Sequence, residues 1–158
     1  MLTSRLVPAP VGDLTLVGSP RGLRRVLWAG QVPAESSDAA SCDVLEEAAR
    51  QLRAYFAGDL RRFNLPLDLV GTDFQVAAWR ALADIPYGTT ISYGEQARRL
   101  GCARAVRAVG AANGRNPLPI VLPCHRIVGA DGSLVGFGGG LSLKRRLLEH
   151  EARVARER

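Results

Sequence analysis

Apolar residues recur with two different spacings in the first 71 residues. Short apolar segments at 14–17 and 23–28 flank a stretch rich in glycine, which is typical of a β-hairpin. Over residues 43–57 the apolar positions follow a helical period instead, and Gly58 stands where a left-handed C-terminal cap belongs. Residues 63–69 alternate as a strand does, although a proline restricts this strand to a sheet edge. The pattern predicts a small lobe of one sheet and one helix.

The remaining residues follow mostly helical spacings. A capping box, in which Ser or Thr is followed three residues later by Glu or Gln, occurs at Thr72 and again at Ser92. These boxes predict a helix over 73–83 and a short helix that ends at Gly101. A third helix, over 103–112, is expected after a tight turn. Two short helices joined by a glycine turn resemble a helix-turn-helix.

The last third of the chain contains a short apolar run and one further helix. The run at 120–122 predicts the end of a buried strand, and Pro123 favours a sharp turn after it. The helix is expected to begin near Ser142, with a buried stripe formed by Leu143, Leu147 and Leu148. Glu151 continues this stripe, and a carboxylate on a core face needs a partner. The alternative is that Glu151 lies in solvent at a frayed helix end.

The length fits one compact unit or two small lobes, and the patterns along the chain favour an α+β fold. A chain of 158 residues can bury a core without disulfides. Its three widely spaced cysteines indicate reduced thiols rather than a disulfide framework or a structural zinc site. No leader sequence and no apolar run of about 18 residues appears, so we expect a cytoplasmic protein with no membrane segment. We expect a small N-terminal α/β lobe, sheet plus helix, over 1–71, and a mostly helical C-terminal lobe with the helix-turn-helix over 72–158.

Net charge distinguishes the two halves. The chain carries +6, and residues 72–158 account for all of it, with 13 Lys and Arg against 7 Asp and Glu; residues 1–71 have 8 of each sign. A basic half favours a polyanionic partner, most often nucleic acid. Because 20 of the 21 basic residues are arginine, the solvated surface of an arginine-rich protein explains the charge equally well.

The predicted helix over 103–112 consists mainly of small residues. Ala105, Ala108 and Gly110 leave little side-chain bulk, so this helix can approach another surface closely. Tight packing against a neighbouring helix is the simpler explanation for the alanines alone. Arg104 and Arg107 are expected to project from one face of the helix. Because an unpaired buried charge is costly, we expect both to face a phosphate backbone or an opened base stack.

Pro123-Cys124-His125-Arg126 places a cysteine beside one of only two histidines. A thiol with a pKa near 8.5 is only a few per cent ionised at neutral pH, so a nucleophilic cysteine needs a neighbour that activates it. Adjacent strand residues point to opposite faces, but a turn after Pro123 lets the two side chains reach one another, directly or through a water. For such a pair in general, an inert thiol beside an incidental imidazole is the more frequent outcome.

Three further features favour chemistry at this pair. Glu151 can fix the tautomer of His125 and stabilise its imidazolium form. Asn116, in a turn ahead of the apolar run, can hold the turn that carries Cys124, or merely brace its own turn. The glycine run at 136–140 can line a pocket with backbone N–H groups, with a plain loop as the alternative.

These residues resemble the active-site signature of the O6-alkylguanine-DNA alkyltransferases, also called methylated-DNA–protein-cysteine methyltransferases. The resemblance extends from Thr72 to Glu151 and includes Asn116-Pro117, the Pro-Cys-His-Arg motif and the glycine run. Residues 1–71 are compatible with the family's variable N-terminal lobe but do not identify it. The resemblance implies a single-turnover DNA repair enzyme. It would flip an O6-alkylguanine out of double-stranded DNA and transfer the alkyl group irreversibly to Cys124.

The resemblance also implies a role for each motif residue. Cys124 would accept the alkyl group, and His125 would act as the base through a water. Glu151 would hold His125, and Asn116 would support the cysteine's turn. Tyr93 would hydrogen-bond N3 of the extruded guanine and so help the base to leave.

Contacts with DNA and with the flipped base are implied in the same way. The family inserts the second helix of its helix-turn-helix into the minor groove, with Arg107 entering the stack in place of the flipped nucleotide. The expected DNA-binding residues are Arg104, Ala105, Arg107, Ala108, Gly110, Asn113 and Arg115. The expected pocket residues are Tyr93, Val128, Gly136, Phe137 and Gly138. At Phe137 many relatives have Tyr, so a hydroxyl near the pocket is missing here while the ring is kept.

The resemblance implies no cofactor and no metal, because residues 1–71 lack the Cys and His cluster that forms a zinc site in some relatives. We expect a monomer in solution that can cluster on DNA. Three other classes of protein compete with this interpretation. A non-catalytic damage binder of the same fold would lack Cys124 and usually carry Trp there. A plain helix-turn-helix regulator would need neither Glu151 nor the cysteine motif. A cysteine hydrolase would leave the basic half unexplained.

Overall fold

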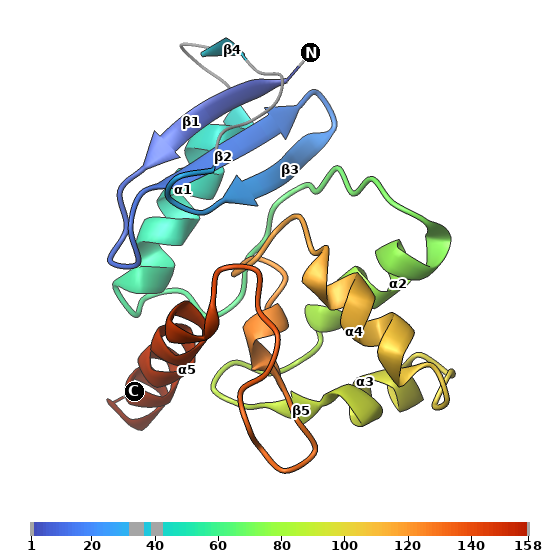
Figure 1. Ribbon diagram of the computed structural model, residues 1–158. Coiled ribbons are helices and arrows are strands. Elements are labelled where there is room, and N and C mark those ends of the chain that lie inside the picture. Colours follow the sequence, from blue (N-terminus) through green and yellow to red (C-terminus); the bar gives the residue numbers. More distant parts are fainter. Residues whose placement is uncertain (1, 32–36, 39–42, 158) are drawn as a thin grey trace. The chain divides into compact units, whose positions relative to one another are not determined.

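The computed structural model describes residues 2–31, 37–38 and 43–157. The chain divides into two compact units, Met1–Val70 and Gly71–Arg158 (Figure 1). Each unit buries apolar side chains of its own. The first is a sheet with one helix and the second is mostly helical, so the predicted α+β class is confirmed.

The N-terminal unit is built on an antiparallel sheet. Its strands are β1 (Thr3–Val7), β2 (Leu14–Ser19), β3 (Gly22–Leu27) and β4 (Ser37–Asp38). They lie in the order β3-β2-β1-β4, with β4 parallel to β1. The predicted hairpin is confirmed as β2 and β3. The sequence pattern missed β1, because its apolar positions are few and one of them, Leu6, is exposed.

Helix α1 (Asp43–Phe56) packs against β2 and β3 (Figure 1). The predicted cap is confirmed: Gly58 has a φ of +83° and its N–H donates to the carbonyl of Tyr55. The predicted strand at 63–69 is wrong. Only an isolated bridge joins Leu23 to Leu67, because Pro66 has no N–H to donate and contributes only its carbonyl, to the Leu23 N–H.

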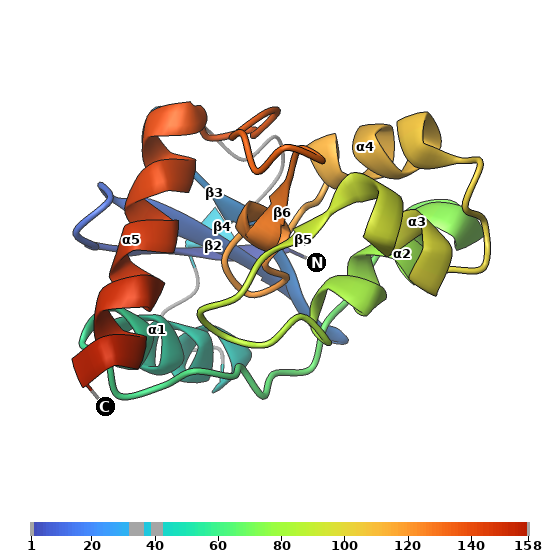
Figure 2. The ribbon, with the colours of Figure 1, turned by 90° about the horizontal axis from the view of Figure 1, so that it is seen from below.

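The described part of the C-terminal unit, residues 71–157, contains four α-helices and a short buried connection. The helices are α2 (Asp73–Leu82), α3 (Tyr93–Arg99), α4 (Val106–Gly114) and α5 (Leu141–Glu157). The connection holds the 3₁₀-helix η1 (Cys124–Arg126) and β6 (Ile127–Val128), and β6 pairs in parallel with β5 (Ile91–Ser92) (Figure 2). Helices α2 and α3 both contact α4, and α5 contacts η1.

Both capping boxes lie at helix starts. Thr72 and Gln75 form the full reciprocal box of α2. Ser92 accepts from the Glu95 N–H at the start of α3, while the Glu95 carboxylate pairs with Arg98 and Arg99 instead of closing the box. The helix-turn-helix is thus formed by α3 and α4.

Two predicted boundaries differ from the structure. Helix α4 begins at Val106 rather than at residue 103, and its N-cap residue, Ala105, makes no side-chain cap hydrogen bond. Residues 120–122 form a buried turn and not a strand. Ile120 has a φ of +74°, and the Leu122 N–H donates to the carbonyl of Leu118 at 2.8 Å. The hydrogen bonds of this segment are therefore local, which is incompatible with a strand.

Among the described residues, no helix combines the length and the apolar character needed to span a membrane.

Candidate active site

His125 and Glu151 form the centre of the site. Nε2 of His125 lies 2.6 Å from Oε2 of Glu151, which confirms the predicted contact between η1 and α5. Both side chains are buried, at 0% and 1% exposure. Glu151 therefore lies on the core face of α5 and not at a frayed end. Although burial alone would raise its pKa, hydrogen bonds and charges of His125 and Arg126 bring the pKa of Glu151 well below its ordinary value.

The protonation of His125 follows from this contact. An ionised carboxylate can only accept, so Nε2 carries the proton that is donated to Glu151. Burial lowers the pKa of His125, and this effect exceeds the opposing influence of Glu151. A neutral imidazole protonated at Nε2 has a lone pair at Nδ1. That atom is buried and has no partner among the described residues, so it can accept a proton.

Cys124 opens η1 and is 8% exposed. Asn116 holds this turn as predicted, since its side-chain amide donates to the Leu122 carbonyl at 2.8 Å and its oxygen accepts from the Leu118 N–H at 3.0 Å. Burial raises the pKa of the Cys124 thiol, while a hydrogen bond from Asn116 and the charge of Lys144 lower it. The net direction is upward, so burial favours the protonated thiol in the resting protein. The thiol needs a base when it reacts.

Lys144 belongs to the site and was missed. Its side chain is buried on the same stripe of α5 as Glu151, and Nζ donates to the carbonyl of Val135 at 2.8 Å. Nζ also lies 5.9 Å from the centre of the Tyr93 ring. Burial lowers the pKa of Lys144, and the nearby Cys124 opposes that shift. The sequence feature that could have drawn attention to Lys144 is that it is the single lysine in the chain.

Tyr93 links α3 to the glycine-containing loop. Its hydroxyl donates to the Val135 carbonyl at 3.1 Å, so this carbonyl accepts from both Tyr93 and Lys144. Gly136 follows with a φ of +52°, and a Cβ there would meet the Tyr93 hydroxyl at 3.5 Å. Burial, followed by the nearby Cys124, raises the pKa of Tyr93, which stays protonated at neutral pH.

The other predicted pocket residues are Val128, which lies on β6, and Phe137 and Gly138, which lie in the loop after β6. Val128 is buried on β6, paired with Ser92 at the start of α3. Phe137 is half-buried in the loop, and Gly138 is exposed with open space beside it. The structure thus brings Val128 and Gly136 next to Tyr93 or its helix.

The predicted DNA-binding residues lie mainly on the surface of α4 and its flanks. Arg104, Arg107, Ala108 and Arg115 are exposed, and Ala105 and Gly110 are half-buried. Arg104 and Ala105 precede the helix, so Arg104 does not share a helical face with Arg107 as expected. Within the described part of the chain, neither Arg104 nor Arg107 forms an ion pair with a carboxylate of the protein.

Asn113 has a different place from the one predicted. It is 8% exposed, its amide donates to Gln96 at 2.7 Å and its oxygen accepts from Gln96 at 3.1 Å. Both polar groups of the side chain are thus used inside the protein, so the prediction that this side chain binds DNA is wrong. Gln96 and Asn113 instead join α3 to α4.

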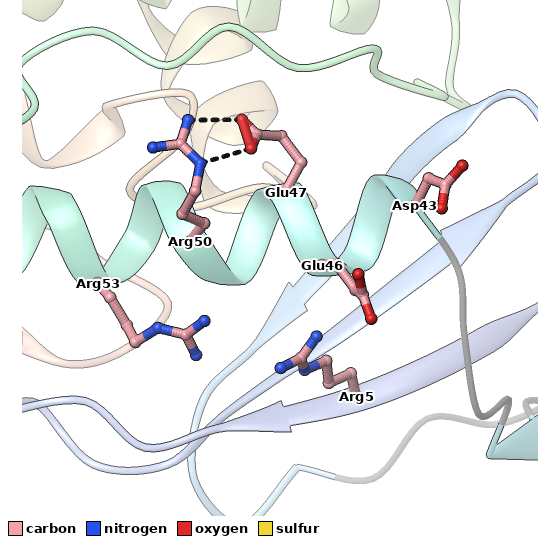
Figure 3. A pocket seen from close by; sticks show the side chains of 6 residues that line it. All are labelled: Arg5, Asp43, Glu46, Glu47, Arg50 and Arg53. Atoms are coloured by element: carbon pink, nitrogen blue, oxygen red, sulfur yellow. Dashed lines mark hydrogen bonds and ion pairs between the residues drawn. The ribbon is translucent and has the colours of Figure 1, made fainter.

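The described cavities of the N-terminal unit carry no comparable chemistry. The larger, of about 510 Å³, is lined by charged side chains of α1 and β1: Arg5, Asp43, Glu46, Glu47, Arg50 and Arg53 (Figure 3). The guanidinium of Arg50 faces the carboxylate of Glu47 at 2.6 Å and brings the pKa of that carboxyl to about 2. Alternating charges on an exposed helix are a solvated surface.

Metal ligands are also not grouped in the described residues. No set of three or more His, Cys, Asp or Glu side chains there could hold an ion.

Two family models match the chain in order. The model described as the 6-O-methylguanine DNA methyltransferase ribonuclease-like domain matches residues 2–69. The model described as the DNA binding domain of 6-O-methylguanine DNA methyltransferase matches residues 73–153. The chain therefore belongs to the 6-O-methylguanine DNA methyltransferase family, which confirms the resemblance seen in the sequence and extends it to the N-terminal unit.

Named relatives and solved structures agree with this assignment. The methylated-DNA–protein-cysteine methyltransferase of Mycobacterium bovis is 48% identical over 153 residues, covering 96% of this chain and 93% of that protein. The protein of the same name from Methanosarcina acetivorans is 45% identical and covers 90% of this chain and 94% of its own. The crystal structure of Mycobacterium tuberculosis OGT in complex with DNA has a TM-score of 0.89 at 46% identity, with 96% and 94% coverage.

Proposed function

We propose that this chain repairs alkylated DNA by moving an alkyl group from O6 of guanine to Sγ of Cys124, once per molecule. The observation that carries the proposal is the arrangement around the thiol. Cys124 sits in a turn held by Asn116, and the next residue is a histidine bound to Glu151 with Nδ1 left to accept a proton. The family membership supplies the class of substrate.

The proton route follows from this arrangement. His125 takes the proton of the thiol at Nδ1, directly or through a water, and Glu151 stabilises the imidazolium that forms. The sulfur then bonds to the alkyl carbon while the carbon–O6 bond breaks, and its electron pair passes to the guanine. A thioether offers water no electrophilic carbonyl, so Cys124 stays modified and the protein acts once.

Base flipping must precede the chemistry, because O6 lies inside the stack of duplex DNA. Extrusion costs a few kcal/mol, least for a poorly paired base. Phosphate contacts from the basic C-terminal unit can offset this cost. We assign these contacts to α4 and its flanks, with Arg107 filling the space of the flipped nucleotide. The exposed arginines support this assignment, as does the relative solved in complex with DNA.

Tyr93 changes partner when the base arrives. Its hydroxyl donates to the Val135 carbonyl in this structure and would donate to N3 of the extruded guanine in the complex. Lys144 continues to donate to the same carbonyl, so Val135 keeps one hydrogen bond during the exchange. The flipped base would then lie between α3 and the loop that contains Gly136, Phe137 and Gly138, with Val128 beneath it.

The proposal also states which unit carries the activity. Residues 72–158 contain every proposed catalytic and DNA-binding residue and all of the net charge. We assign both binding and transfer to that part of the chain. The expected working form is a cytoplasmic monomer that meets double-stranded DNA containing O6-alkylguanine and needs no cofactor.

Intact mass after incubation with duplex DNA containing O6-methylguanine tests the proposal. The protein should gain the mass of one methylene group, and peptide mapping should locate it at Cys124. Cys124→Ala should gain nothing, whereas Cys102→Ala, which removes the other described free thiol, should gain the same mass as wild type. An unchanged wild-type mass would leave a damage binder or a regulator as the function.

Arg107 is tested by comparing two substrates. Arg107→Ala should slow transfer from duplex DNA more than transfer from the free modified base, because only the duplex has a stack to fill. Raising the salt concentration should weaken duplex binding, with a log–log slope of about −0.9 per phosphate contacted. Equal losses on both substrates would remove Arg107 from the proposed role.

A further inference from the structure

Arg126 has no part in the steps described above, yet it is held by more hydrogen bonds than most side chains of the site. Its side chain is 6% exposed. Nε donates to Oε1 of Glu151 at 2.8 Å, and Nη2 donates to Oε2 at 3.0 Å. Nη1 donates to the carbonyl of Ile85 at 2.7 Å, and Cζ lies 5.4 Å from the centre of the Tyr87 ring.

Glu151 is therefore shared between two neighbours in the sequence. Its Oε2 accepts from both His125 and Arg126, while Oε1 accepts from Arg126 and, at 3.3 Å, from the Gly88 N–H. The forked contact with the guanidinium fixes the plane of the carboxylate. In that plane one oxygen points at Nε2 of His125, so rotation of Glu151 away from His125 would break both bonds to Arg126.

We propose that Arg126 is a positioning residue that keeps His125 a neutral proton acceptor, by fixing the carboxylate of Glu151 and cancelling its charge. The inference rests on the proposed function, in which His125 must take a proton from Cys124. It goes beyond that function because it assigns the resting protonation state of the base to a residue that touches neither thiol nor DNA base.

The reason is electrostatic. A lone buried carboxylate is unfavourable, and a buried Glu151 without Arg126 would be neutralised by an imidazolium at His125. A base that is already protonated cannot accept the proton of the thiol. With Arg126 in place, guanidinium and carboxylate cancel, and a further charge on His125 would be uncompensated in the interior. Burial then lowers the pKa of His125, and the charge of Arg126 adds to that shift.

Other charged groups near His125 do not supply this balance. Among the described residues, the charged groups that act on the pKa of His125 are Glu151 and Lys144 from α5 and Arg126 from η1, and the titratable Cys124 precedes His125 in η1. Lys144 donates to a backbone carbonyl and not to Glu151. Proton transfer breaks the S–H bond and forms an N–H bond at His125, so one anion and one cation appear together. The total charge of the cluster is unchanged, which makes the transfer compatible with its burial.

The pH at which His125 titrates tests the inference without requiring alkyl transfer. The chain has two histidines, so NMR of isotope-labelled histidine reports His125 with His150 as an internal reference. Arg126→Gln can still donate to Glu151 but removes the charge, and we expect the pKa of His125 to rise. Arg126→Lys keeps a charge without the fork and should leave that pKa near the wild-type value.

The pH dependence of the rate of transfer from O6-methylguanine DNA should follow the pKa of His125 in each variant. For each unit by which the pKa of His125 exceeds the buffer pH, the neutral fraction and the rate fall about tenfold. Arg126→Gln should therefore be slow at neutral pH and recover in alkaline buffer. Arg126→Lys should lose rate equally at every pH, because its defect is in position.

Two results would overturn the inference. In the first, His125 titrates at the same pH in Arg126→Gln as in wild type, which would reduce Arg126 to a structural residue. The second result concerns Glu151→Gln, which is the variant to measure if Arg126→Gln does not fold. Glu151→Gln leaves the charge of Arg126 unbalanced beside His125 and must then lower the pKa of His125, and no shift in that variant would contradict the proposed charge balance. If wild type transfers no alkyl group while these shifts are seen, only the proposed function fails.

Discussion

The buried charge of Lys144 stabilises the thiolate of Cys124 and at the same time carries a desolvation penalty. The Lys144 side chain is buried and forms no ion pair with a carboxylate among the described residues, and its charge favours the thiolate of Cys124. We predict that Lys144→Met raises the pKa of Cys124 further, so that alkylation of the thiol by iodoacetamide shifts to higher pH. The melting temperature should not fall, because a desolvated charge is removed and the Val135 carbonyl still accepts from Tyr93.

The matched control for this prediction is Lys144→Arg. It keeps the charge, so the pH dependence of thiol alkylation should stay near that of wild type even if the larger side chain lowers stability. The rate is measured by mass spectrometry against pH, and stability by thermal unfolding. A Lys144→Met variant that reacts with the wild-type pH profile would show that the ammonium does not act on the thiol.

At the residue scale, the sequence predicted the side chains that form a recognisable motif. Cys124 and His125 are adjacent, and Glu151 stood out as a carboxylate on an apolar stripe. Lys144 lies on that stripe too, seven residues earlier, but a long amphipathic side chain there is expected to reach solvent. Arg126 was passed over for the opposite reason: its burial depends on Ile85 and Glu151, which are distant in the sequence.

At the scale of elements, the helix-turn-helix depends on a buried amide pair. Gln96 of α3 and Asn113 of α4 exchange two hydrogen bonds at 2% and 8% exposure. We predict that Gln96→Leu and Asn113→Leu each lower the free energy of unfolding by about 1–3 kcal/mol, because each leaves a buried amide unsatisfied. The double variant should lose less than the sum, since no polar group remains unpaired.

Urea unfolding of the two single variants and the double variant measures this coupling. Duplex binding should weaken in all three, because the pair sets how α4 sits on α3. Gln75→Leu, which removes the side-chain half of the capping box of α2, is the control and should be additive with Asn113→Leu. Additive losses for Gln96→Leu and Asn113→Leu would mean that the two amides do not stabilise each other.

The starts of α2 and α3 were predicted from the side chains that cap them, whereas the start of α4 was not. Thr72 and Ser92 accept the hydrogen bonds that begin α2 and α3, so the start of each helix can be read from local chemistry. The start of α4 has no such cap. The turn at 120–122 was read as a strand because its residues are apolar and buried. Its conformation is set by Asn116, whose bonds to Leu118 and Leu122 cannot be read from hydropathy.

At the scale of the whole chain, chemistry and charge concentrate in one unit. The proposed site residues and the net positive charge all belong to Gly71–Arg158. In the described part of Met1–Val70 the one buried polar side chain is Gln51, and its bonds are to Glu47 and to the backbone of Asn64. Hydrophobic periodicity therefore predicted the class of both units, whereas the family of the N-terminal unit required comparison with known proteins.

The burial of two titratable side chains, His125 and Glu151, in this unit predicts how acid affects the stability of the protein. The pKa of His125 is lower in the folded state than its ordinary value of 6.5, so below about pH 6.5 the unfolded state binds a proton that the folded state does not. Stability is therefore lost as the pH falls from about 6.5. The pKa of Glu151 is also lowered, from 4.5, so a second loss begins as the pH falls below about 4.5.

His125→Asn separates these two stages. Each proton taken up only by the unfolded state lowers the free energy of unfolding by about 1.4 kcal/mol per pH unit. The wild-type protein should lose stability at up to this slope between pH 6.5 and 4.5, in addition to any loss common to both proteins. His125→Asn should lack that part, because its buried amide does not titrate. Urea unfolding at intervals of pH gives both curves. Parallel curves in that range would show that His125 is not held neutral in the interior, and the proposed base would then already carry its proton at rest.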